Sequence, residues 1–120
     1  MESPIKNNPQ KARELLEDTL KRNPRNYVAH YGLADILDEF FNDLEGAQMH
    51  YKASLEINPK CEEAHNNYAF FLSSKCDDYV NAKMHYEAAI AIIPQYAEAH
   101  NNYAFLLKTK LNDEEGAKIS

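Results

Sequence analysis

Histidine is the residue type of this chain with the widest chemical range, because an imidazole can bind a metal, carry a proton or act as a base. His30, His65 and His100 are spaced 35 residues apart, and so are His50 and His85. On successive helical hairpins the first three would lie about 8–10 Å apart, too far to share one ion. His65 and His85 could approach each other within one hairpin, but no carboxylate or thiolate clearly completes a ligand set. We therefore expect packing histidines, with no metal and no other cofactor.

The remaining residues give no sign of catalysis. Cys61 and Cys76 lie near opposite ends of one predicted helix, so a rise of about 1.5 Å per residue puts them roughly 22 Å apart, beyond the reach of a disulfide. The sequence contains no pair of cysteines with zinc-site spacing and no Gly-rich phosphate loop, nucleophile elbow or kinase signature. We expect a protein without enzymatic activity.

Two adjacent asparagines occur in an eight-residue segment that is found twice in the sequence. "HNNYAFFL" occupies residues 65–72, and "HNNYAFLL" occupies residues 100–107. The offset of 35 residues recurs at other positions, listed here: Pro24, Pro59 and Pro94; Ala12, Ala47, Ala82 and Ala117; Tyr51 and Tyr86. A fixed period of this length is the mark of a repeat protein.

Composition limits the class of protein. A chain of 120 residues with 44% hydrophobic residues is enough for one domain with a modest core, which we assign to residues 1–120. The formal charge of −6 argues against a nucleic-acid partner or an acidic membrane surface. No apolar run approaches the roughly 20 residues that span a bilayer, and the first residues lack a signal-peptide core. The default expectation is a cytoplasmic protein, with the nucleus as the alternative.

Each repeat reads as two helices. Within residues 61–75 the apolar face is formed by Ala64, His65, Tyr68, Phe71 and Leu72, at helical spacing. Asp77 or Asp78 can cap a second helix, whose face comprises Tyr79, Ala82, Tyr86, Ala89, Ile90 and Ile93. Pro94 ends this helix. The chain is therefore expected to be all-α.

These residues resemble the tetratricopeptide repeat, whose pattern is W-x2-L-G-x2-Y, then A-x3-F, then P. The first repeat shows His30, Leu33, Ala34, Leu37, Ala47, Tyr51 and Pro59; the second shows His65, Tyr68, Ala69, Leu72, Ala82, Tyr86 and Pro94; the third shows His100, Tyr103, Ala104, Leu107 and Ala117; a half repeat supplies Ala12, Leu16 and Pro24. Histidine replaces the usual tryptophan, alanine replaces the usual glycine, and the period is 35 rather than 34.

The resemblance implies a right-handed α–α superhelix of stacked antiparallel hairpins. It divides the chain into a half repeat at about 1–25, repeats at about 26–60 and 61–95, and an incomplete repeat at about 96–120. Alanines 34, 69 and 104 on first helices should face alanines 47, 82 and 117 on second helices, so that the backbones approach closely. One added residue per period falls at the turn between the two helices, where its cost is small.

The resemblance also implies a function. First helices of tetratricopeptide proteins line a concave groove, where an asparagine contacts the backbone of a bound peptide, since an amide can satisfy the donor and the acceptor of a peptide unit. The groove residues would be Asn66, Asn67, Asn101, Asn102, Phe70 and Phe105, with Tyr31 and Asp35 in the first repeat. The alternative is that the asparagines are only solvated and that the phenylalanines belong to the core.

The charge of this groove bears on its ligand. Family members that hold a terminal carboxylate use lysine and arginine, whereas this chain offers Val28, Glu63 and Glu98, with Lys108 as the nearby cation. The expected partner is therefore a protein or peptide segment that is apolar, neutral or basic. A second hypothesis is weak head-to-tail self-association through the incomplete terminal repeats, because an unfinished hairpin leaves its apolar face uncovered.

Overall fold

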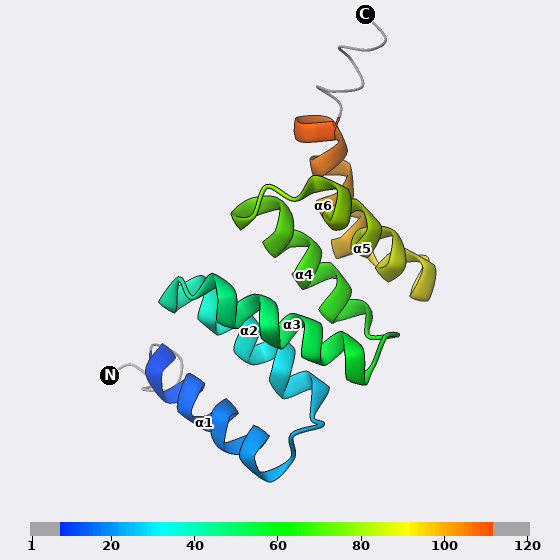
Figure 1. The fold of residues 1–120 in the computed structure, drawn as a ribbon. Coiled ribbons are helices and arrows are strands. Elements are labelled where there is room, and N and C mark those ends of the chain that lie inside the picture. Colours follow the sequence, from blue (N-terminus) through cyan, green and yellow to red (C-terminus); the bar gives the residue numbers. More distant parts are fainter. Residues whose placement is uncertain (1–7, 112–120) are drawn as a thin grey trace, which may run out of the picture. The chain divides into compact units, whose positions relative to one another are not determined.

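The computed structural model describes residues 8–111, and every element in this part of the chain is a helix (Figure 1). The elements are α1 (Pro9–Arg22), α2 (Tyr27–Phe41), α3 (Leu44–Ile57), α4 (Glu62–Lys75), α5 (Tyr79–Ile92), α6 (Ala97–Leu106) and a π-helical turn, η1 (Leu107–Leu111). The prediction of an all-α protein is confirmed for these residues. None of the helices found between residues 8 and 111 has the length and apolar character needed to cross a bilayer.

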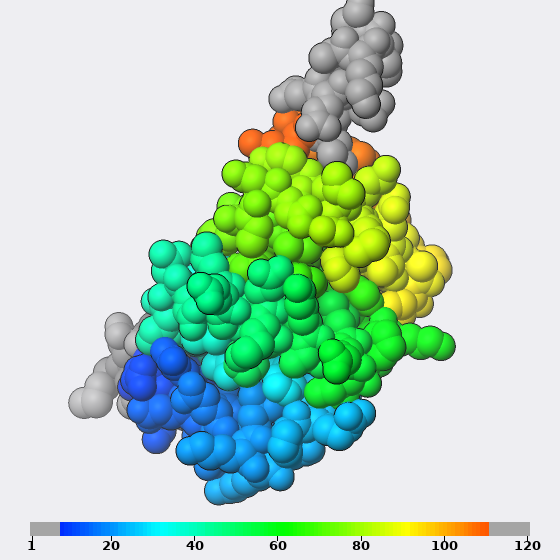
Figure 2. Space-filling model, viewed as in Figure 1, coloured from blue at the N-terminus to red at the C-terminus, as the bar shows by residue number. Residues whose placement is uncertain are grey.

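The chain divides into two compact units, Met1–Pro59 and Lys60–Ser120. In the first unit α2 packs against both α1 and α3, and in the second unit α5 packs against both α4 and α6. Within each unit the consecutive helices run antiparallel (Figure 1). The side chains of α4 and α5, coloured green to yellow, form one continuous surface (Figure 2). Each unit thus has a helical hairpin with a third helix packed beside it.

The two hairpins turn in the same way. Asn42 and Asp77 adopt left-handed backbone conformations, with φ of 51° and 53°, which asparagine and aspartate tolerate better than other residues with a side chain. The next residue, Asp43 or Asp78, donates its N–H back to a leucine carbonyl of the first helix at 2.9 Å. Its carboxylate then accepts a backbone N–H of the second helix, as an N-cap. Of the two caps that the sequence allowed, Asp77 and Asp78, the cap is Asp78.

Small residues allow the helices of each hairpin to approach closely. Ala34 and Ala47 in the first unit are fully buried, and so are Ala69 and Ala82 in the second. The face predicted within residues 61–75 is also confirmed, because Ala64, His65, Tyr68, Phe71 and Leu72 are all buried. These buried residues pack α4 against α5.

Three expectations for α5, α6 and the residues after them are not confirmed. Ile93 was predicted to be on the apolar face of α5, and this is wrong: the residue caps the C-terminus of the helix and is 39% exposed. Ala104 is exposed, and the alanine expected opposite it, Ala117, lies outside the described residues. The last part of the incomplete repeat, residues 112–120, also lies outside them.

The helix ends follow the sequence signals. Asn8 caps α1 by accepting the backbone N–H of Lys11 at 3.0 Å, and Pro9 occupies the first turn. Helix α5 ends at Ile92, two residues before Pro94, the residue that was expected to end it. Cys61 and Cys76 are the N-cap and C-cap of α4, and neither forms a disulfide within residues 8–111; the first is buried and the second exposed.

Candidate functional site

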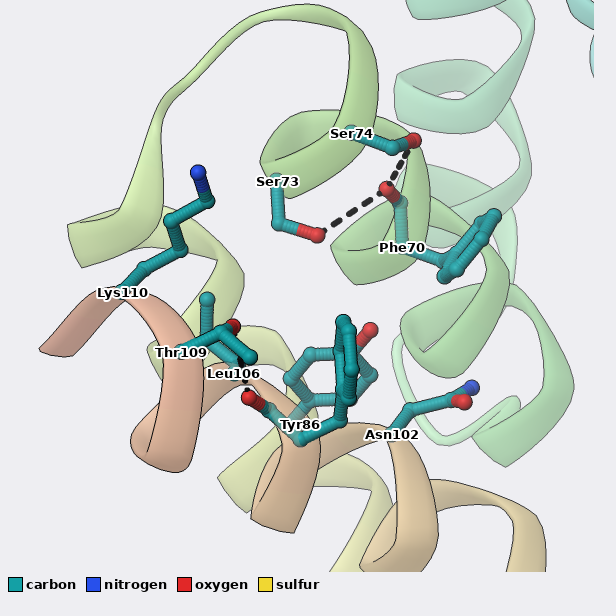
Figure 3. Close-up of a pocket in the computed structure, with 9 residues that line it drawn as sticks. Phe70, Ser73, Ser74, Tyr86, Asn102, Leu106, Thr109 and Lys110 are labelled. Atoms are coloured by element: carbon teal, nitrogen blue, oxygen red, sulfur yellow. Dashed lines mark hydrogen bonds between the residues drawn. The ribbon is translucent and has the colours of Figure 1, made fainter. Parts of the chain in front are cut away.

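A cavity of about 200 Å³ lies in the second unit, where α4, α5, α6 and η1 meet (Figure 3). Figure 3 shows residues of α4 on one side and residues of α6 and η1 on the other, with Tyr86 of α5 between them. The lining residues are Phe70, Ser73, Ser74, Tyr86, Asn102, Phe105, Leu106, Thr109 and Lys110. We call these residues and the adjoining faces of the two first helices the α4–α6 surface.

Helices α4 and α6 run in the same direction along this surface. Near their N-termini, the side chain of Asn66 is hydrogen-bonded to Glu98 and Asn102. Further along, Phe70 of α4 and Phe105 of α6 line the same cavity, and beyond them Ser74 and Thr109 do so as well. Residues one period apart on the two helices are therefore neighbours, which is why the repeated sequence produces a surface of matching side chains.

The two phenylalanines are the most exposed aromatic residues of this surface. Phe70 is 53% exposed and Phe105 is 67% exposed, whereas Phe71 is fully buried. The alternative that the predicted pair belongs to the core does not hold, because the buried position is taken in each helix by the next residue, Phe71 in α4 and Leu106 in α6. Water therefore meets two aromatic rings at one cavity, an arrangement that in soluble proteins often marks an interaction site.

The asparagines take different places. Asn66 is 1% exposed; its Oδ1 accepts from Nδ2 of Asn102 at 3.2 Å, and its Nδ2 donates to Glu98 at 2.9 Å. It therefore cannot touch a ligand in this conformation, and instead it orients Asn102. Asn102 is half-buried and lines the cavity, Asn67 is half-buried beside Asn66, and Asn101 is exposed but is not among the lining residues.

The two predicted groove residues of the first repeat, Tyr31 and Asp35, belong to the first unit and are half-buried there. The hydroxyl of Tyr51 donates a hydrogen bond to the carboxylate of Asp35. Burial, and then the negative charge of Asp35, raise the pKa of Tyr51. Asp35 thus ties α2 to α3, a structural role that its sequence position did not indicate.

Four polar residues of the cavity were not predicted from the sequence. The hydroxyls of Ser73 and Ser74 donate to the carbonyl of Phe70 at 3.1 and 2.6 Å, and Thr109 donates to the carbonyl of Phe105 at 2.7 Å. Lys110 lines the cavity, where Lys108 had been named as the nearby cation. Ser74 and Thr109 are one 35-residue period apart, so the repeat itself could have identified these two hydroxyl groups as equivalent positions.

Tyr86 forms a rigid wall of the cavity. It is 1% exposed, and its ring stacks on that of Tyr103 with 5.9 Å between centroids. Burial is the main cause that raises the pKa of Tyr86 to about 12; the charge of Glu98 acts in the same direction, and a hydrogen bond with Ser73 opposes it. The phenol is neutral at physiological pH, as an ordinary tyrosine also is, so this wall of the cavity carries no charge.

The histidines form two equivalent pairs. The Nδ1 atoms of His65 and His85 are 2.9 Å apart, which confirms that they approach within one hairpin, and those of His30 and His50 are 3.0 Å apart. Burial is the main cause that lowers the pKa of His85 to about 4. Within residues 8–111 no three or more histidine, cysteine, aspartate or glutamate side chains are grouped to hold a metal ion.

A second contact explains the recurrence of histidine on the first helices. The Nε2 atoms of His30 and His100 lie 2.8 and 2.7 Å from the carbonyl oxygens of Pro24 and Pro94. In this geometry the ring N–H donates to a carbonyl in the loop that precedes the helix. His30 and His100 therefore fasten the loops that precede α2 and α6.

No protein-family model matches this chain, and a search of curated proteins finds no significant match either. The function is therefore inferred from the residues of the α4–α6 surface and from the repeated sequence.

Proposed function

We propose that this chain is a non-catalytic scaffold of the tetratricopeptide kind, which binds an extended segment of another protein on the α4–α6 surface. The recurrence of the repeat pattern over nearly the whole sequence supports the family. The right-handed superhelix of stacked hairpins is part of the same proposal, and the shared turn geometry at Asn42 and Asp77 supports a regular repeat.

The observation that carries the proposal is the cavity between two exposed aromatic rings. A volume of about 200 Å³ is enough for one bulky apolar side chain, since an apolar cavity of about 150 Å³ can hold benzene. Phe70 and Phe105 would lose their contact with water when such a side chain enters. The apolar area buried would favour binding by about 25 cal/mol per Å².

Asn102 supplies the polar contact. One hydrogen of its Nδ2 is used by Asn66, so its Oδ1 and its second N–H are left for a ligand. These two groups match the N–H and the C=O of one peptide unit, whatever side chain the peptide carries. A segment could therefore be held by its backbone at Asn102 and by one side chain in the cavity.

A peptide selection tests this function. Displayed random 12-residue peptides would be selected on the purified chain, and the best ligand titrated by fluorescence anisotropy. We expect Phe105→Ala to weaken binding at least tenfold and Asn102→Ala to weaken it several-fold. Phe40→Ala and Asn101→Ala are the matched controls, because Phe40 is 57% exposed on α2 and Asn101 is exposed outside the cavity lining.

Failure to select any ligand, or a ligand bound equally by Phe105→Ala and Phe40→Ala, would contradict the proposal. The same preparation tests the alternative of self-association. If a second copy of the chain is the ligand, light scattering will show a mass that rises with concentration, and Phe105→Ala will abolish that rise. A chain that stays monomeric while it binds a selected peptide supports the scaffold function.

A further inference from the structure

We infer that the α4–α6 surface prefers a ligand with a lysine or arginine about three residues from the apolar side chain that fills the cavity. This inference rests on the proposed function and adds the chemistry of the partner. It comes from an uneven distribution of charge along the two parallel helices, which has carboxylates at one end and an ammonium group at the other.

The acidic end is formed by Glu62 and Glu63 in the first turn of α4 and Glu98 in the first turn of α6. The hydrogen bond between Asn66 and Glu98 brings the carboxylate of α6 to α4. None of these three glutamates has an ion-pair partner among residues 8–111. Each helix N-terminus offsets about half a charge, so roughly two of the three negative charges remain uncompensated.

These carboxylates also act on a neighbouring phenol. Burial, and then the charges of Glu98, Glu63 and Glu62, raise the pKa of Tyr96 to about 12. Because all three glutamates influence one side chain in the loop before α6, they form a single negative region. A cationic side chain of a ligand would be attracted to this region, and salt would weaken the attraction.

The opposite end of the surface carries the positive charge of Lys110. Lys110 belongs to η1 and lines the cavity, and its Nζ lies 5.9 Å from the centroid of the Tyr79 ring. A ligand cation placed at this end would be repelled. The surface therefore favours a ligand whose positive group lies beside the N-termini of α4 and α6, and it disfavours a ligand whose positive group lies beside η1.

The spacing follows from helix geometry. Glu98 precedes Phe105 by seven residues, and a rise of 1.5 Å per residue puts their backbones about 10 Å apart. An extended peptide covers roughly 3.3 Å per residue, so the same distance corresponds to about three residues. The charge distribution does not fix which of the two side chains comes first, so both orders enter the test.

Synthetic peptides test the inference. Labelled ten-residue peptides of alanine and serine would carry one leucine, and either lysine or glutamate three residues before or after it. In one of the two orders we expect the lysine peptide to bind at least tenfold more tightly than its glutamate counterpart at low salt. This ratio should shrink in 0.5 M salt, and a peptide without leucine should bind at least tenfold more weakly.

Chain variants locate the effect. Glu63→Gln combined with Glu98→Gln should reduce the lysine preference, measured as the ratio of the affinities of the lysine and glutamate peptides, to about twofold or less. Glutamine at position 98 still offers an oxygen to Asn66, so the fold is kept, which circular dichroism would verify. Glu45→Gln is the matched control, because Glu45 is an exposed first-turn glutamate of α3 in the other unit.

The outcomes separate the two proposals. Leucine peptides that bind with equal affinity whether they carry lysine or glutamate would overturn the charge preference and leave the scaffold function standing. A glutamate preference would overturn it as well and would assign the dominant charge to Lys110. Absence of binding for every leucine peptide, together with an empty selection, would refute the proposed function itself.

Discussion

Acid should destabilise the protein through the buried pair of His65 and His85. The ring of His85 packs against Tyr68 with 4.9 Å between centroids, and its Nδ1 lies 2.9 Å from that of His65. Burial first, and the charge of His65 second, lower the pKa of His85 from 6.5 to about 4, against the opposing charge of Asp78. The folded protein thus favours the neutral imidazole.

The direction of the pH effect follows from this depressed pKa. In the unfolded chain His85 takes up a proton near pH 6.5, whereas in the folded chain it does so only near pH 4. Its contribution to stability is complete above pH 6.5 and is lost as the pH falls from 6.5 to 4. The full shift corresponds to about 3 kcal/mol at 1.36 kcal/mol per unit. Water reaches the half-buried ring, so we expect a loss of about 1–2 kcal/mol.

Urea unfolding followed by circular dichroism at pH 7.5, 6.5, 5.5 and 4.5 measures this loss. His85→Phe keeps an aromatic ring and removes the titrating group. Between pH 7.5 and pH 4.5 the free energy of unfolding of this variant should therefore decrease by about 1–2 kcal/mol less than that of the original chain. His100→Phe is the control, because His100 is exposed and bonded to a carbonyl. This variant should keep the pH dependence of the original chain.

Two results would refute this account of the histidine pair. One is a pKa of His85 near 6.5, obtained from the pH dependence of its ring C–H signals in NMR spectra. The other is an identical pH dependence of unfolding in His85→Phe and in the original chain. Either result would mean that burial and His65 do not hold His85 in the neutral form.

Three further expectations concern packing, capping and thiol reactivity. In urea titrations, Ala82→Leu should lower the free energy of unfolding by about 1–3 kcal/mol, because the larger side chain overpacks the α4–α5 hairpin. The control is Ala91→Leu, at an exposed position of the same helix, which should change the free energy of unfolding by less than about 0.5 kcal/mol. Asp78→Ala should cost about 1 kcal/mol in the same assay, because the N-cap of α5 loses its acceptor. Exposed Cys76 should react with an aromatic disulfide reagent much faster than buried Cys61, because burial raises the pKa of the Cys61 thiol. In Cys76→Ser only the slow phase of the thiol reaction should remain. A fast phase that persists in this variant would contradict the assignment of fast reaction to Cys76.

Local structure could be predicted from the sequence because its causes are local. The aspartate caps and the prolines are short-range signals, and they placed the start of α5 after Asp77 or Asp78 and its end near Pro94. The apolar spacing within residues 61–75 likewise identified the buried face of α4, since helical periodicity decides which residues share a face. Ile93 was misplaced because the helix ends before it.

The candidate site depended on the tertiary structure. Asn67 and Asn102 have equivalent positions in the sequence, but packing of α6 beside α4 leaves only Asn102 of this pair at the cavity and buries Asn66. Tyr86 was recognised as a core residue of α5, yet it also forms a wall of that cavity. These outcomes depend on the relative register of helices that are distant in sequence.

The sequence by itself therefore determined a repeated pair of capped helices with a defined apolar face. The tertiary structure decided which polar side chains remain available, because burial depends on the neighbours that a fold supplies. The paired histidines illustrate both parts. Their 20-residue spacing, from His65 to His85, is written in the sequence, but the shift in pKa arises from the water that α4 and α5 exclude when they pack together.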